Sequence, residues 1–151
     1  MYTEEFTEVH DVLAVLAPTA ANAAVGAHVT GYVDLADYHR AFFLLQIGES
    51  AGAGTIDVTV QQARDTDGTG AKALTTIAGA AKSPTQVVAA DAEGYVGIEI
   101  RSPELDVTNG FHCIQVTVTI GGAVYYYSGL LLGVCSRYEA VGVTDFQEVV
   151  H

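Results

Sequence analysis

The residue types best suited to bind an ion lie in the loop RDTDGTG, residues 64–70, where Asp65 and Asp67 precede Gly68 and Gly70. Alternating carboxylates beside a glycine are typical of calcium loops, because Ca²⁺ takes several oxygen ligands from a sharply turned backbone. The further ligands of such a loop do not follow, since the next residues are AKAL. A phosphate-binding loop would end in Lys and Ser or Thr before a helix. We therefore predict an exposed turn that Asp and Gly stabilise.

The histidines do not have the short spacing of a zinc-binding pair. They are His10, His28, His39, His112 and His151. His112 and Cys113 are adjacent, and adjacent side chains of a strand point to opposite faces, so we do not expect them to share an ion. The sequence predicts no metal site and no cofactor.

The sequence shows none of the usual residue patterns of nucleophilic catalysis. A Gly-x-Ser-x-Gly turn is absent from the sequence, and Ser128 lies in a strand-like run with no base close to it in sequence. Cys113 and Cys135 are interpreted as two buried thiols, with a bridge between neighbouring strands as the alternative. The chain is predicted not to be an enzyme.

Three consecutive tyrosines, Tyr125, Tyr126 and Tyr127, form the most distinctive aromatic feature. In a strand, two of the rings point to one face and one to the other. Cross-strand packing in the core, a subunit interface and a stacking platform for sugars all remain open as explanations. The absence of tryptophan from the sequence counts against the sugar platform.

Alternating apolar and polar residues indicate the elements that must position these side chains. In GTIDVTVQQAR the residues Ile56, Val58 and Val60 share one face, which is the period of a half-buried strand. The segments YVGIEIRS and FHCIQVTVTI repeat this pattern. We predict further strands over residues 28–35, 73–78, 86–89 and 137–142. Eight or nine such strands predict an all-β fold, an antiparallel, jelly-roll-like β-sandwich.

Two runs are apolar on both faces, residues 40–48 and 124–132. Such strands lie centrally in a sheet or face a neighbour on their outer side. Gly121 and Gly122 precede the second run and predict a two-residue hairpin with the strand before it. The candidates for an oligomer or capsid interface are the apolar residues of these runs, Phe42, Leu44, Tyr125, Tyr127, Leu130 and Leu132.

We expect residues 1–151 to form a single β-sandwich domain. Residues 1–16 form a possible N-terminal arm, in which EEFTEVHDVLAVLAP is either a strand or a helical turn, and residues 143–151 form a possible C-terminal tail. Residues 103–110 are expected to hold one helical turn.

The composition favours contacts with other subunits. Half of the residues are hydrophobic and only 16% are charged, so either part of the surface is covered by subunits or it is rich in Ala and Gly. The net charge of −12 argues against nucleic acid and anionic membranes as partners. The sequence contains no signal-peptide pattern and no convincing membrane span.

The chain also resembles small virion structural proteins of tailed bacteriophages over roughly residues 28–141. The resemblance rests on Tyr38-His39-Arg40 before an apolar strand, on Gly48 to Gly54 and Val58 to Leu74, and on the later NGFHCIQVTVT and YYYSGLLLGVCSRYEAV. It implies a head decoration or cement protein, often trimeric, that binds the major capsid protein between capsomers. It further implies a place in the virion, after assembly in the host cytoplasm, and no catalytic residues. The alternative is a carbohydrate- or receptor-binding β-sandwich of the phage tail.

Overall fold

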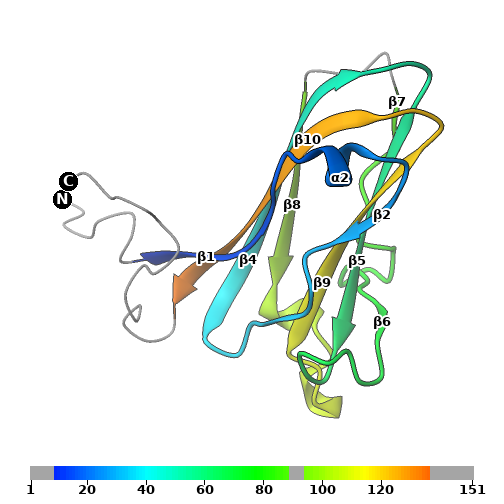
Figure 1. Cartoon of the computed structure of the whole chain (residues 1–151). Helices are drawn as coiled ribbons and strands as arrows, with labels where there is room; N and C mark the ends of the chain where they lie inside the picture. Colours follow the sequence, from blue (N-terminus) through cyan, green and yellow to red (C-terminus); the bar gives the residue numbers. More distant parts are fainter. Residues whose placement is uncertain (1–8, 89–93, 137–151) are drawn as a thin grey trace.

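Two antiparallel sheets pack face to face in this computed structural model, which describes residues 9–88 and 94–136 (Figure 1). The four-stranded sheet has the order β1 (His10–Leu16), β10 (Tyr125–Ser136), β4 (Tyr38–Ser50), β8 (Tyr95–Arg101). The six-stranded sheet has the order β2 (Gly26–Val29), β9 (Cys113–Gly121), β5 (Thr55–Ala63), β6 (Lys72–Ala73), with β3 (Val33–Asp34) paired to β9 and β7 (Val87–Val88) paired to β5. The prediction of an all-β antiparallel sandwich is therefore confirmed.

The core lies between the two sheets and follows the predicted alternation. Ile56, Val58 and Val60 of β5 are buried, and the alternate residues of β9 from Ile114 to Ile120 lie beside them on the same face of the sheet, in the same core cluster. β5 and β9 pair in register over nine residue positions. Because of this long continuous pairing, β9 and β5 are the two central strands of the six-stranded sheet.

The predicted hairpin between β9 and β10 is wrong. Gly122 does turn the chain, with a φ of 76°, but β9 pairs within the six-stranded sheet and β10 pairs with β1 and β4 in the other sheet. The chain therefore crosses from one layer to the other at this point. The physical reason is that both edges of β9 are already occupied, one by β5 and the other by β2 and β3, so β10 pairs with β1 and β4 instead.

The predicted strand over residues 28–35 is interrupted, and β2 and β3 both pair with β9. With this interruption the described residues form ten strands, of which three have only two residues. The predicted strand over 73–78 is reduced to β6, and that over 86–89 to β7.

The ends of the chain differ from the expected arms. Residues 10–16 are not part of an arm, because β1 pairs with β10 inside the four-stranded sheet. Residues 1–8, the predicted strand at 137–142 and the tail at 143–151 lie outside the described residues.

The helical content consists of short turns. The expected turn within residues 103–110 is present as two 3₁₀ turns, η2 (Ser102–Glu104) and η3 (Val107–Asn109). One α-helical turn, α2 (Ala20–Ala23), joins β1 to β2. None of the helices in the described ranges has the length and apolarity of a membrane span.

Candidate functional site

An apolar band crosses the outer face of the four-stranded sheet in two rows. In the first row Val12, Leu132 and Phe42 are register partners across β1, β10 and β4. In the second row Val15, Leu130 and Leu44 are partners across the same strands. Residues directly opposite in antiparallel strands project to the same face. The six side chains therefore form one continuous surface, which we call the apolar band.

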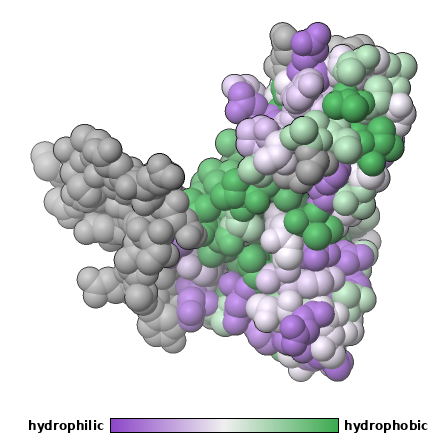
Figure 2. Space-filling model, in the orientation of Figure 1, coloured by the Kyte–Doolittle hydropathy of each residue, from purple (hydrophilic) through white to green (hydrophobic). Residues whose placement is uncertain are grey.

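The band lies on the side of the sheet away from the core. Phe43, Leu45 and Leu131, which alternate with its members, are fully buried in the core cluster. The members of the band on β4 and β10 are only partly buried, and Val15 is 58% exposed. Figure 2 shows the hydrophobic surface gathered over the middle of this sheet, with hydrophilic areas above and below it.

A β-bulge in β1 and a glycine in β8 shape the edges of the band. The register of β1 against β10 shifts between Val12 and Ala14, which keeps both Val12 and Val15 on the outer face. On the other edge, the ring of Phe42 lies over Gly97, where an added Cβ would meet the Phe42 Cζ at 3.0 Å. The absence of a side chain at Gly97 lets this ring approach the backbone of β8 closely.

One end of the band is charged and hollowed. A cavity of about 320 Å³ lies there, lined by His10, Arg40, Ala41, Phe42, Glu99, Leu132 and Val134. Arg40 and Glu99 form an exposed ion pair at 3.1 Å on its rim. The arrangement, an apolar centre with a polar rim, is the usual anatomy of a protein–protein interface.

Two of the six predicted interface residues do not lie on the outer face of the sheet. Tyr125 and Tyr127 are 0% and 3% exposed and belong to the core cluster, so core packing is the correct explanation for them. Tyr126 points outward. Phe42, Leu44, Leu130 and Leu132 do lie on the outer face, whereas Val12 and Val15 were missed because the bulge breaks the alternation of β1.

The buried hydroxyl of Tyr127 allows a test of this placement. Among the described residues its oxygen has no hydrogen-bond partner, and burial raises the pKa of Tyr127 to about 12. An unsatisfied buried polar group costs about 1–3 kcal/mol. We expect Tyr127→Phe to leave the free energy of unfolding unchanged or to raise it by about 1 kcal/mol in denaturant titrations. A loss of more than about 1 kcal/mol would show that the hydroxyl is bonded.

The loop at residues 64–70 is the predicted turn. The Asp65 carboxylate accepts hydrogen bonds from the N–H groups of Asp67 and Thr69, at 3.1 and 2.9 Å. A hydrogen bond from the Thr69 side chain, together with these backbone bonds, holds the pKa of Asp65 below its usual value. Gly68 has a φ of 84° and lies against the ring of Tyr32. The carboxylate is thus engaged in closing its own loop.

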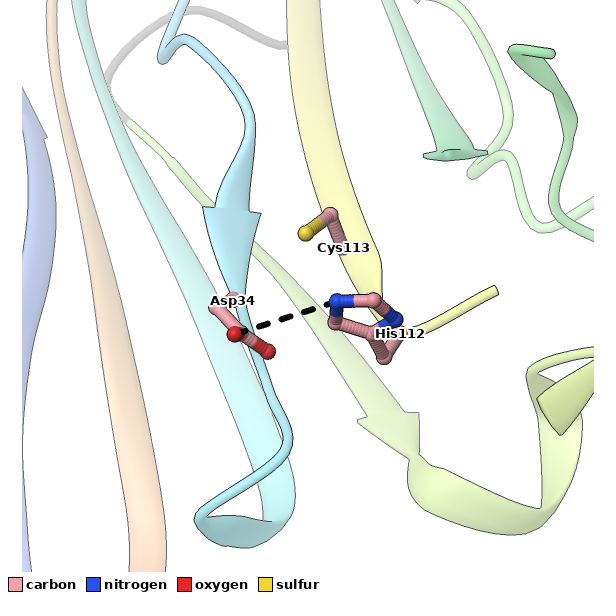
Figure 3. Close-up of side chains that lie close together, drawn as sticks. All are labelled: Asp34, His112 and Cys113. Carbon is pink, nitrogen blue, oxygen red and sulfur yellow. Dashed lines mark ion pairs between the residues drawn. The ribbon is translucent and has the colours of Figure 1, made fainter. Parts of the chain in front are cut away.

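A polar cluster that the sequence did not predict lies where β3 meets β9 (Figure 3). It consists of Asp34, His112 and Cys113, whose potential ligand atoms all lie within 4.8 Å of one another. The expectation that His112 and Cys113 diverge is wrong, because His112 precedes the first residue of β9. Gly110, with a φ of 82°, ends the preceding turn, and the strand geometry begins only at Cys113.

Cys113 is a free thiol, so for this residue the alternative of a disulfide bridge is overturned. Burial raises the pKa of Cys113 to about 11, and the carboxylates of Asp34 and Asp65 contribute to the shift. The thiol is therefore protonated at neutral pH. The side chain of Cys135 lies outside the described part of the structure.

Comparison of the chain with protein-family models and with curated proteins gives no match. Its two candidate sites, the apolar band and the Asp34–His112–Cys113 cluster, are therefore interpreted from their own geometry.

Proposed function

We propose that this protein is a structural subunit of a bacteriophage particle, a decoration or cement-type protein that acts by binding. The observation that carries this proposal is the apolar band, through which copies of the chain associate with one another. The resemblance of residues 28–141 to small virion proteins supplies the assembly, a homo-oligomer on the phage head in contact with the major capsid protein. A trimer is the form that this resemblance favours.

The band supports association for a physical reason. Each Å² of apolar surface removed from water stabilises a complex by roughly 25 cal/mol before ordering costs. A contiguous apolar patch on an otherwise polar protein marks an interaction surface. Six apolar side chains in two register-matched rows offer such a patch on one sheet face.

The charge of the chain predicts how this association responds to salt. Each copy carries a net charge of −12, so copies repel one another at low ionic strength. Added salt screens this repulsion, with a Debye length of about 8 Å at physiological ionic strength. Association through the apolar band is therefore expected to strengthen as salt is raised. The same charge disfavours nucleic acid and anionic membranes as partners.

A charge placed in the middle of the band tests the proposal. Leu132→Lys adds a desolvation cost to any interface that covers the band, so the mass from light scattering behind a sizing column is expected to fall from that of a trimer to that of a monomer. Thr59→Lys is the matched control, because Thr59 is exposed on β5 in the other sheet. It should leave the mass unchanged.

The masses of the wild type and of Leu132→Lys distinguish between three possibilities for the assembly. A wild-type trimer that only Leu132→Lys dissociates supports the proposal and leads to binding tests on bare capsids. A wild-type protein that stays monomeric at high concentration and high salt contradicts self-association through the band. A trimer that survives Leu132→Lys places the interface elsewhere on the chain.

A carbohydrate- or receptor-binding role in the phage tail is the second candidate. The tyrosine triplet no longer favours it, since two of the three rings are in the core. What favours it is the exposed ring of Tyr126 beside a shallow hollow of about 240 Å³, which Gln46 and Ser128 also line. Sugar titrations that show no binding, or equal binding by Tyr126→Ala, would eliminate it.

A further inference from the structure

The geometry points to a binding site for a zinc-class transition-metal ion formed by Asp34, His112 and Cys113. The site does not depend on the assembly proposed above. A thiolate, an imidazole and a carboxylate are the three ligand types that Zn²⁺ takes from proteins. Three protein ligands leave a fourth position for water or another donor.

The strand pairing brings the ligands together. Asp34 of β3 and Cys113 of β9 are register partners, so their side chains project to the same face of the sheet. The Asp34 Oδ2 lies 3.9 Å from the His112 Nε2, and all three ligand atoms lie within 4.8 Å of one another. Bonds of about 2.0–2.3 Å hold the donors of a tetrahedral zinc site about 3.3–3.6 Å apart. Small side-chain rotations therefore suffice to close the site around an ion.

The imidazole is oriented as a metal ligand requires. The Nδ1 of His112 lies 3.0 Å from the carbonyl oxygen of Gly110, which can only accept a hydrogen bond, so Nδ1 carries the proton. Nε2 is the ring nitrogen that faces Asp34 (Figure 3), so in the neutral form of the ring its lone pair points into the cluster. A backbone carbonyl that fixes the tautomer in this way is the usual support of a metal-bound histidine.

The carboxylate is oriented as well. The Asp34 Oδ1 accepts a hydrogen bond from the N–H of Ala36 at 2.8 Å, which leaves Oδ2 facing His112. Cys113 is fully buried, whereas the side chains of Asp34 and His112 are 51% and 41% exposed. The carboxylate and the imidazole are therefore within reach of an ion in solvent, and the sulfur lies within 4.8 Å of both of their ligand atoms.

The charges balance when the ion binds. The thiol gives up its proton, because the thiolate is the ligand. One thiolate and one carboxylate then neutralise the charge of a divalent ion, while the imidazole stays neutral. The bound ion joins β3 to β9, which otherwise pair over only two residues. We therefore expect the site to stabilise this edge of the six-stranded sheet.

Cobalt titration of the full chain under reducing, oxygen-free conditions tests the site. The wild type is expected to bind one equivalent of Co²⁺, with a thiolate-to-cobalt charge-transfer band and the visible bands of a tetrahedral centre. Zn²⁺ should displace the cobalt and raise the melting temperature. Cys135→Ser should behave as the wild type, and Cys113→Ser should lose the charge-transfer band.

Two further variants keep the test independent of the buried cysteine, whose replacement can disturb folding. Asp34→Asn and His112→Gln alter partly exposed side chains, and each is expected to weaken Co²⁺ binding at least about 10-fold. His39→Gln is the matched control, because His39 is an exposed histidine on β4.

Three results would overturn the inference. The first is a wild type that shows no charge-transfer band with Co²⁺ in excess. The second is a band that persists in Cys113→Ser, which would place the ion on Cys135. The third is unchanged affinity in both Asp34→Asn and His112→Gln. Because light scattering reports the assembly separately, a failure here is distinguishable from a failure of the proposed function.

Discussion

Replacing Glu104 with glutamine is expected to lower the free energy of unfolding by about 3 kcal/mol. The Glu104 side chain is only 1% exposed, and both of its oxygens accept hydrogen bonds from the Lys82 ammonium, at 2.7 and 2.8 Å. One oxygen also accepts the N–H of Arg101 at 2.9 Å. Glutamine keeps the shape but leaves the largely buried Lys82 without its counter-charge. Removing one partner of a buried ion pair is far more costly than removing both.

The pH dependence of this effect has a defined sign. Burial alone would raise the pKa of Glu104, but the hydrogen bonds from Lys82 and Arg101, with their positive charges, outweigh it and hold the pKa below its ordinary value of 4.5. A carboxyl whose pKa is lower in the folded state stabilises the fold above the unfolded pKa and loses that contribution as the pH falls through the folded value. The difference in unfolding free energy between wild type and Glu104→Gln should thus have its largest value at neutral pH and become smaller as the pH falls below about 4.5.

Denaturant titration at several pH values measures both effects. Glu99→Gln is the matched control, because Glu99 pairs with Arg40 at the surface, where both side chains are more than half exposed. An exposed pair contributes about 1 kcal/mol or less. Equal losses of unfolding free energy in Glu99→Gln and Glu104→Gln would contradict the assigned role of Glu104. A loss in Glu104→Gln that stays the same at acidic pH would also contradict it.

Replacing Phe43 with alanine is expected to cost about 3–5 kcal/mol of unfolding free energy, the range for removing a phenylalanine from a packed core. Phe43 is fully buried on the inner face of β4, and its ring fills the space above Gly129 of β10. An added Cβ at Gly129 would lie 2.9 Å from the ring, so these two positions are matched in volume. The surrounding side chains of a packed core relax only partly into the cavity that alanine leaves.

The adjacent residue provides the comparison. Phe42 lies on the outer face of the same strand, in the apolar band, so Phe42→Ala should cost only about 1 kcal/mol in the monomer. It should instead weaken the self-association that light scattering detects. Two neighbouring phenylalanines thus report on different properties, Phe43 on the core and Phe42 on the interface. Similar losses of stability at both positions, with unchanged mass, would contradict the division between inner and outer faces.

The amino-acid pattern alone was sufficient to predict the class of fold and the core of its long strands. Strict alternation in β5 and β9 assigns each residue to a face, because successive side chains of a strand point in opposite directions. A second local rule, the preference of Asp and Gly for turns, predicted that residues 64–70 form a turn. These predictions succeeded because they depend on the nearest neighbours in the chain.

Pairing between distant strands was decided only by the tertiary structure. Nothing near Gly121 and Gly122 shows that the chain crosses between sheets there, because the choice depends on β5 and β1, which are far away in sequence. Tyr125 and Tyr127 were named as interface candidates, with core packing left open, because β10 is apolar on both faces. Which face meets the core is set by the register with β4.

Both candidate sites depend on local sequence patterns and on pairing between distant strands. The composition predicted an apolar outer surface on the strands at 40–48 and 124–132, but the two register-matched rows of the band exist only because β1, β10 and β4 lie side by side. The Asp34–His112–Cys113 cluster depends on the pairing of β3 with β9 and on a turn that ends at Gly110. Sequence determines the faces of each strand, whereas long-range pairing determines which faces meet, because the pairing energy comes from partners that no local pattern identifies.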